Sequence, residues 1–256
     1  MISYPMTFRP TMQPDPRPVA GPTDLDDAPS TLIEAAYRQI RRDIVLGVHA
    51  PGARLRVEHL KARYGASSGT LREALALLVA DALVVAQGQR GFSVAPMSLA
   101  DLEDLSYVRS LVEAEAASQS LARGNDEWEA RLVSAFHKLS LTEERLAART
   151  SEVYEEWERR NFEFHEALVG ACGSPRLLEA RARLHLQAER YRRLSALDGP
   201  RPGAVHAEHE QIFKFALARN APALAEVLRR HVRRSLDVIR DSGLLGGKPL
   251  IGGRAA

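Results

Sequence analysis

The fold is decided by the stretch Tyr64-Gly65-Ala66-Ser67-Ser68-Gly69-Thr70-Leu71-Arg72-Glu73-Ala74-Leu75-Ala76-Leu77-Leu78, which predicts a turn followed by a helix. Gly65 supplies the permissive backbone of the turn, and Ser67 is a good N-cap for the helix. The apolar residues at 71, 74, 75 and 78 follow helical spacing and predict a buried face. The other face begins with hydroxyl side chains and an arginine, which suits the major groove of DNA.

The residues on either side of this stretch predict two more helices and a hairpin. The helices are expected at about 31–46 and 58–64, because each is followed by glycine after an apolar helical pattern. Two β-prone runs at 83–86 and 92–94 flank a polar tip that contains two glycines, as in a β-hairpin. Three helices and a hairpin predict a winged helix–turn–helix domain over residues 30–96.

The pattern over residues 31–95 resembles the DNA-binding domain of GntR-type bacterial transcription regulators. The residues that carry the resemblance are Ile44, Leu46, Gly47, Pro51, Gly52, Leu55, Leu60, Tyr64, Gly65, Ser67, Leu71, Arg72, Glu73, Ala74, Leu75, Leu78, Gly91 and Val94. The resemblance implies that this domain binds a double-stranded DNA operator through the recognition helix and the wing.

The DNA contacts implied by the resemblance come from the start of the recognition helix and from the wing. They are Ser67, Ser68, Thr70, Arg72, Gln89, Arg90 and Gly91. The chain departs from the family pattern where Ser68 replaces a frequent arginine and Gly69 replaces a common threonine. Arginine is the usual bidentate reader of guanine, so we expect Arg72 and the wing to supply more of the binding here.

The rest of the chain predicts further helices separated by short joins that contain Gly, Pro or Asn. The expected helices run over about 99–123, 127–148, 152–171, 176–196, 203–219 and 221–242. The fold is therefore expected to be mainly α, with the winged helix–turn–helix followed by an all-α bundle of six or seven helices over residues 97–243. Residues 1–29 predict a flexible tail because they are rich in Pro, Asp and Thr and show no periodicity, and residues 244–256 predict a second tail because they are rich in glycine.

Composition and charge limit the class of protein. Of the 256 residues, 45% are hydrophobic and 27% are charged, which is typical of a globular chain. Residues 30–96 hold nine Lys and Arg against five Asp and Glu, whereas the chain beyond them holds 24 of each. No apolar run is long enough to cross a bilayer, and we expect no secretion signal and no membrane partner. The single cysteine, Cys172, is expected to be a buried thiol in a cytoplasmic protein.

Polar residues recur on otherwise apolar faces of the predicted bundle. Asn161 and His165 are one turn apart on one helix, whereas His209 and His231 belong to two other helices. These stretches resemble the FCD ligand-binding domain of the FadR-like branch of GntR regulators, over about residues 99–240. In that family an aspartate at the position of Asn161 joins three histidines in holding a divalent metal ion. The resemblance therefore implies a metal site at Asn161, His165, His209 and His231.

Two interpretations of this cluster stay open. Three neutral imidazoles can hold Zn, Ni or Mn with open coordination positions, although Asn161 offers only a neutral carbonyl oxygen where the family has a carboxylate. In the alternative, the histidines are partly buried, are satisfied by hydrogen bonds and line a polar pocket without metal.

The effector site is expected next to this cluster. Arg109 lies between apolar positions of the first bundle helix, and Glu113 follows one turn later. The resemblance implies that Arg109 reaches the carboxylate of a small effector, for which the guanidinium fork is well suited. The alternative is an ion pair with Glu113, worth only ~0.3–0.5 kcal/mol if exposed. The candidate effector-binding residues are Arg109, Asn161, His165, His209 and His231.

The helix predicted at 176–196 carries two less specific features. His185 either lines a cavity or only packs against neighbouring helices. The run Arg190-Tyr191-Arg192-Arg193 predicts a solvated basic face of the helix. His206, three residues before His209, is expected at the mouth of a pocket or in solvent.

The sequence favours an effector-responsive transcription regulator, expected to be a homodimer and a repressor, and not an enzyme. A metal-dependent hydrolase that uses the histidine cluster is one rival. The motif His-Glu-x-x-His is absent from the sequence, and no nucleophile or general base accompanies the cluster. A winged helix used only for protein contacts is the other rival, and it predicts little or no salt-dependent DNA binding.

Overall fold

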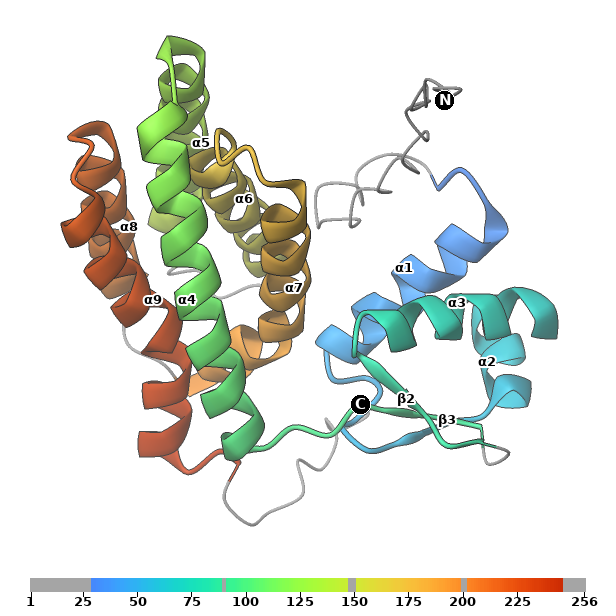
Figure 1. The fold of residues 1–256 in the computed structure, drawn as a ribbon. Helices are drawn as coiled ribbons and strands as arrows, with labels where there is room; N and C mark the ends of the chain where they lie inside the picture. Colours follow the sequence, from blue (N-terminus) through green and yellow to red (C-terminus); the bar gives the residue numbers. More distant parts are fainter. Residues whose placement is uncertain (1–28, 89–90, 147–150, 199–201, 246–256) are drawn as a thin grey trace, which may run out of the picture.

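The computed structural model describes residues 29–88, 91–146, 151–198 and 202–245. Over these ranges nine α-helices and three short strands form an N-terminal head and a helical bundle, which lie beside each other in Figure 1. The mainly α architecture predicted from the sequence is confirmed. The tails predicted at 1–29 and 244–256 fall almost entirely outside the described residues.

The head combines three helices with a small antiparallel sheet. Its helices are α1 (Leu32–Val45), α2 (Val57–Tyr64) and α3 (Ser68–Ala80), and its strands are β1 (Arg54–Leu55), β2 (Val84–Ala86) and β3 (Phe92–Val94). The strand order is β1-β3-β2, with Leu55 opposite Phe92 and Val84 opposite Val94. The sequence predicted the hairpin of β2 and β3 but missed β1, because a strand of two residues has no readable alternation.

Local signals fix the position of α3. Gly65 ends α2 at φ +63°, a left-handed conformation that favours glycine. Ser67 then caps α3, since its hydroxyl accepts a hydrogen bond from the backbone N–H of Thr70 at 3.1 Å. The buried face of α3 consists of Leu71, Ala74, Leu75 and Leu78, and it joins Ile40 of α1 in the core of the head. The opposite face of α3 is left to solvent, as predicted.

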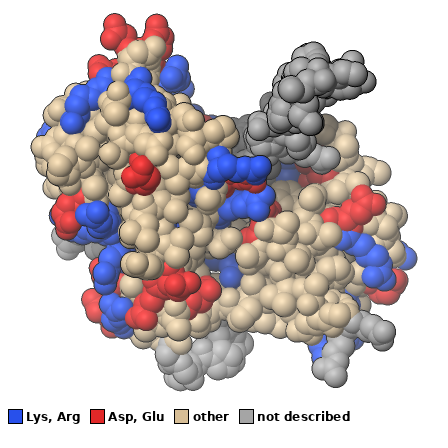
Figure 2. All heavy atoms as spheres, in the orientation of Figure 1, with Lys and Arg blue, Asp and Glu red and all other residues tan. Residues whose placement is uncertain are grey.

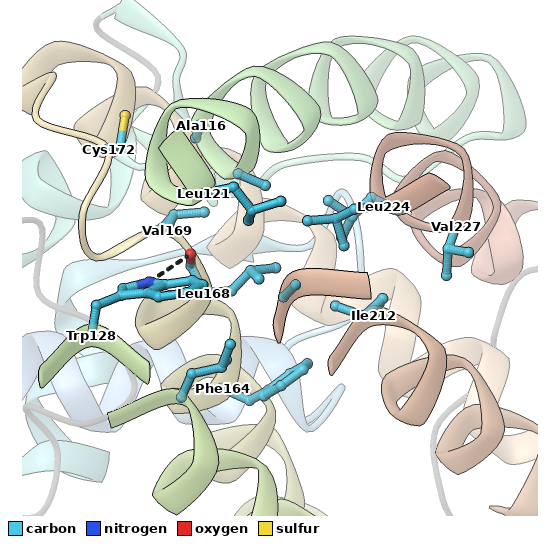
Figure 3. Packing of buried hydrophobic residues seen from close by; sticks show 14 of the residues in the cluster. Ala116, Leu121, Trp128, Phe164, Leu168, Val169, Cys172, Ile212, Leu224 and Val227 are labelled. Carbon is cyan, nitrogen blue, oxygen red and sulfur yellow. Dashed lines mark hydrogen bonds between the residues drawn. The ribbon is translucent and has the colours of Figure 1, made fainter. Parts of the chain in front are cut away.

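The bundle is built from longer helices that pack along one another (Figure 1). They are α4 (Leu99–Arg123), α5 (Asp126–Arg145), α6 (Ser151–Val169), α7 (Pro175–Asp198), α8 (Pro202–Leu217) and α9 (Ala221–Ser242). Trp128 of α5 is fully buried in the core, and its Nε1–H donates to the carbonyl of Leu168 at 3.2 Å (Figure 3). Cys172 lies in the same core as a buried free thiol, as predicted. None of the helices in the described ranges combines the length and apolar character that a membrane span requires.

The head is joined to the bundle through helix α7. Arg41 of α1 forms an ion pair with Glu189 of α7, and both side chains are buried. Arg190 of α7 donates to the carbonyl oxygens of Ala95 and Pro96, at 2.8 and 3.3 Å, and so holds the linker between the domains. A cavity of about 460 Å³ opens between α1 and helices α6 and α7. Basic and acidic side chains lie together along this junction in Figure 2.

The prediction that residues 190–193 form a solvated basic face is wrong for most of the run. Arg190 and Tyr191 are buried, and Arg192 forms a buried ion pair with Glu158 of α6 at 2.8 Å. The error has a physical reason. A run of arginines looks solvated when one helix is considered alone, but here carboxylates and carbonyls from other segments provide the hydrogen bonds that burial demands.

The buried pair at this junction gives a stability prediction. We expect Arg41→Ala to lower the free energy of unfolding by about 3–5 kcal/mol, because the carboxylate of Glu189 is left buried without its partner. The matched control is Arg42→Ala, whose pair with Glu155 is exposed on both sides and is worth at most ~1 kcal/mol. Urea denaturation of both variants measures the difference, and equal midpoints would contradict the assigned role of the buried pair.

Candidate DNA-binding helix and metal centre

The first turn of α3 presents the predicted recognition residues. The hydroxyls of Ser67 and Thr70 lie 2.9 Å apart and hydrogen-bond to each other. Ser68 is half-buried, whereas Arg72 is exposed and its guanidinium makes no hydrogen bond or ion pair with any residue in the described ranges. The guanidinium of Arg72 is therefore accessible from solvent on this face of α3.

The wing lies on the same domain as α3. The backbone N–H of Gln87 donates to the carbonyl of Gly91 at 2.8 Å and closes the turn between β2 and β3. Gly91 has φ +90°, where only glycine is unstrained. The predicted contact residues Gln89 and Arg90 lie outside the described residues.

The three predicted histidines converge inside the bundle. His165 comes from α6, His209 from α8 and His231 from α9, and each offers a ring nitrogen within 4.8 Å of those of the other two. The ring centroids of His209 and His231 are 4.7 Å apart. His165 and His209 are buried, and His231 is largely buried. Such a convergence of imidazoles from three helices is a geometry suited to a transition-metal ion.

Two carboxylates behind the cluster orient the rings. Glu143 of α5 accepts from Nδ1 of His209 at 2.6 Å and from Nδ1 of His206 at 2.8 Å. Glu208 of α8 accepts from Nδ1 of His231 at 2.9 Å. Because an ionised carboxylate only accepts, each Nδ1 carries the hydrogen and each Nε2 keeps a lone pair for a metal ion. His206 is 41% exposed, in agreement with its expected place at the edge of the site.

The protonation states of these groups also suit metal binding. Burial, together with the charges of His231 and His209, holds the pKa of His165 well below its usual value. Burial also lowers the pKa of His231 to about 4, against the opposing effect of its hydrogen bond to Glu208. Burial alone would raise the pKa of Glu208, but hydrogen bonds from His231 and Arg234 lower it to about 2. The imidazoles of His165 and His231 are therefore neutral ligands at pH 7 and Glu208 is charged.

Unpaired polar atoms mark where the metal ion would lie. Oδ1 of Asn161, Nδ1 of His165 and Nε2 of His209 are buried and find no hydrogen-bond partner within the described ranges. A buried polar atom without a partner is rare, because its lost hydration is not replaced. These donor atoms fit a divalent metal ion, so the alternative in which hydrogen bonds satisfy the histidines is not what this geometry favours.

Arg109 lies beside the cluster and pairs with Glu113, but the pair is buried and not exposed to solvent. Its side chain is buried, and its Nη2 donates to Glu113 at 3.3 Å. Burial lowers the pKa of Arg109 to about 10, although the charge of Glu113 opposes the shift. Nε of Arg109 has no partner among the described residues, so this guanidinium keeps a donor for a ligand.

Three residues near the site were missed or left open by the sequence interpretation. Glu143 gave no signal, because a lone glutamate on an amphipathic helix is normally exposed. Arg181 is fully buried and forms ion pairs with Glu166 and Glu113, a burial that the helix pattern alone does not predict. His185 is buried with its ring centroid 5.8 Å from that of His165, which places it in the site.

Comparison with known families now identifies the chain. Residues 32–94 match the family described as "Bacterial regulatory proteins, gntR family", and residues 104–234 match the FCD domain. The chain belongs to the GntR family of transcription regulators. The winged helix of this GntR regulator is its DNA-binding domain, and the bundle is an effector-binding domain of the FCD type.

Curated relatives agree with this assignment. The chain is 48% identical over 215 residues to the uncharacterized HTH-type transcriptional regulator BphR of Paraburkholderia xenovorans, covering 84% of this chain and 88% of the relative. It is 37% identical over 211 residues to the HTH-type transcriptional repressor GlaR of Escherichia coli, covering 80% and 94%. This GntR-family protein is thus a transcription regulator and not an enzyme, and the hydrolase alternative finds no support.

Solved structures share the fold of this regulator. Escherichia coli McbR/YncC superposes with a TM-score of 0.66 at 19% identity, over 83% of this chain and 99% of that one. A putative transcriptional regulator GntR from Rhodococcus sp. RHA1 gives a TM-score of 0.61 at 24% identity, over 84% and 98%.

The carboxylate behind His209 gives a metal-binding prediction. Glu143 uses both oxygens, one for each of two histidines, whereas glutamine has only one acceptor oxygen. We therefore expect Glu143→Gln to weaken Zn²⁺ binding by about 10–100-fold, because His209 is no longer held in one orientation. The neighbouring exposed residue supplies the control, Glu144→Gln. Competition with a chromogenic chelator measures both affinities, and equal values would show that Glu143 does not position His209.

Proposed function

We propose that this GntR-family protein is a homodimeric repressor. When a small carboxylate binds in the FCD domain, the repressor dissociates from its operator or its two DNA-binding heads change their arrangement on the DNA. The observation that carries the proposal is the convergence of His165, His209 and His231 within 4.8 Å, in a bundle that α7 joins to the DNA-binding head. The curated relative GlaR is named a repressor, which supports the same direction of control. We place the protein in the cytoplasm, where bacterial DNA lies.

In the proposed complex the first turn of α3 enters the major groove and the wing contacts the DNA beside it. The contact residues are Ser67, Ser68, Thr70 and Arg72 on the helix side and Gln89, Arg90 and Gly91 in the wing. The exposure of Arg72 and its lack of a partner among the described residues support its role as the main reader. Ser67 and Thr70 are partly engaged with each other, so they suit phosphate contacts more than base contacts.

The effector site is proposed to hold Zn, Ni or Mn through Asn161, His165, His209 and His231. When bound, such an ion polarises and holds a carboxylate oxygen at its open positions. Arg109 donates from its free Nε to the same carboxylate. Glu143 and Glu208 keep the rings of His209 and His231 in the ligating orientation.

Binding in the bundle can alter DNA affinity only if the effector prefers one arrangement of the heads. Helix α7 provides a connection, because it carries His185 near the site and Glu189 at the contact with α1. A shift of α7 by the effector would therefore move or release the pair between Glu189 and Arg41.

The dimer is proposed to form through the exposed apolar face of α4. Tyr107 and Leu111 are one turn apart on this helix and are 63% and 49% exposed. Large apolar side chains that lie together on a surface are typical of an interaction site. A two-fold axis beside α4 would present two copies of α3 to a near-palindromic operator.

Arg72 provides the test of the DNA-binding assignment. We expect Arg72→Ala to weaken binding to a promoter fragment by about 10–100-fold, which is the usual effect of losing one base-reading arginine. The control is Arg131→Ala, which removes an exposed arginine from α5 in the bundle. Gel shift at fixed salt measures both, and wild-type affinity in the Arg72 variant would remove α3 from the interface.

The proposed interface has its own test. We expect Leu111→Glu to convert the dimer to a monomer, because two facing glutamates would be desolvated without partners. Leu141→Glu is the matched control, since Leu141 is 48% exposed and belongs to a different helix, α5. Light scattering coupled to gel filtration gives the mass. A dimer that persists in the Leu111 variant would exclude this face of α4.

A further inference from the structure

Helix α7 brings two polar side chains into the effector site that the proposed metal and Arg109 do not use. Arg181 and His185 are one turn apart on α7, and both are at most 1% exposed. The ring of His185 lies 5.3 Å from that of Phe162 and 5.8 Å from that of His165, between ring centroids. The guanidinium carbon of Arg181 also lies over the ring of Phe162, 5.8 Å from its centroid.

The hydrogen bonds of Arg181 are incomplete. Its Nη2 donates to Glu166, but Nε and Nη1 have no hydrogen-bond partner in the described part of the chain. Arg192, three turns further along the same helix, has a complete set of hydrogen-bond partners. Its Nε, Nη1 and Nη2 all donate, to Glu158 and to the carbonyl of His185. Burial on α7 is therefore compatible with a fully bonded arginine. Arg190 is intermediate, because both of its terminal nitrogens donate and only Nε lacks a partner in the described ranges. Of these three arginines, Arg181 leaves the most nitrogens without a partner, Nε and Nη1.

His185 has the same deficit. Neither Nδ1 nor Nε2 has a hydrogen-bond partner among the residues described, although both atoms are buried. A neutral imidazole offers one donor and one acceptor, so the pair of side chains presents a surplus of donors toward the site. Water-free burial of such donors is unfavourable unless another group accepts from them.

The charges around Arg181 also leave room for an anion. Glu113 is 1% exposed and lies between two guanidiniums, 3.3 Å from Arg109 and 3.6 Å from Arg181. The other carboxylate on Arg181 belongs to Glu166 and is 42% exposed, so solvent screens its charge. One fully buried carboxylate thus faces two buried guanidiniums. Two further carboxylates lie behind the proposed metal ligands: Glu143 hydrogen-bonds His209, and Glu208 hydrogen-bonds both His231 and Arg234, whose charge balances it.

We propose that the effector is a dicarboxylate, whose first carboxylate lies at the metal and Arg109 and whose second is bound by Arg181 and His185. The proposal rests on the proposed function, because it assigns the second end of the same ligand. Arg181 and His185 determine specificity: they reject a monocarboxylate, whose apolar end would leave their donors unpaired. The second carboxylate also ties the ligand to α7, the helix that contacts the head through Glu189.

The test compares linear dicarboxylates of three to six carbons with the monocarboxylates of equal length, by calorimetric titration of the Zn²⁺-loaded full chain. For at least one length we expect the dicarboxylate to bind wild type about 10-fold or more tighter than its monocarboxylate. Arg181→Gln is expected to abolish this advantage while monocarboxylate binding changes less than about twofold. The control Arg183→Gln, an exposed residue of α7 paired with Glu179, should leave both affinities unchanged.

His185→Phe is the second variant, because it keeps a ring in the core and removes only the polar atoms. It should lower the dicarboxylate advantage several-fold, and it decides the matter if Arg181→Gln does not fold. Equal binding of both acid series to wild type, or equal losses for both series in the variants, would overturn the assignment and leave the proposed function standing. No binding by either series overturns both. A dicarboxylate advantage that depends on Arg181 without bound Zn²⁺ supports the assignment and removes the metal from the proposed function.

Discussion

The burial of charged side chains along α7 is the constraint on which the rest of the structure depends. Burying a guanidinium without carboxylates or carbonyls around it is strongly unfavourable, so each buried arginine of α7 restricts what can pack beside it. Arg190 fixes the linker carbonyls of Ala95 and Pro96, and Arg192 fixes Glu158 of α6. Glu189 in turn requires Arg41 of the head. The position of the DNA-binding head against the bundle follows from these requirements more than from apolar contact.

The same physical rule explains how the histidine cluster is held. Imidazoles from α6, α8 and α9 would be free to rotate if only apolar groups surrounded them, and a metal ion needs them in one orientation. Glu143 ties α5 to α8 through His209, and Glu208 ties α8 to α9 through His231. The helices that form the site are thus connected by the hydrogen bonds that orient its ligands. Apolar packing around Trp128 supplies the stability, and these polar bonds supply the geometry.

Much of the fold could be predicted from the sequence, because its signals are local. Gly65 and Ser67 mark the turn and the cap of α3 through backbone chemistry that a single stretch contains. The histidine positions were available through resemblance to a family. What could not be predicted depends on contacts between residues far apart in the chain. These are the pairing of strand β1 with β3, the burial of Arg190, the ion pair of Arg192 with Glu158, and the contact of Glu143 with His209. A helix pattern shows which residues share a face, but not which partners another helix brings to that face.

The hydrogen bonding of polar side chains along α7 affects how the regulator can respond to a ligand. Along α7, Arg181 and His185 each have two buried nitrogens without a partner in the described ranges, whereas Arg190 and Arg192, further along the helix, donate to the linker and to Glu158. The carbonyl of His185 itself accepts from Arg192, which holds Glu158. A ligand that completes the hydrogen bonds at Arg181 and His185 therefore acts on a helix whose next two turns are already committed to the linker and to α1. Because buried ion pairs tolerate little displacement, even a small movement of α7 must be shared with the head or must break one of these pairs.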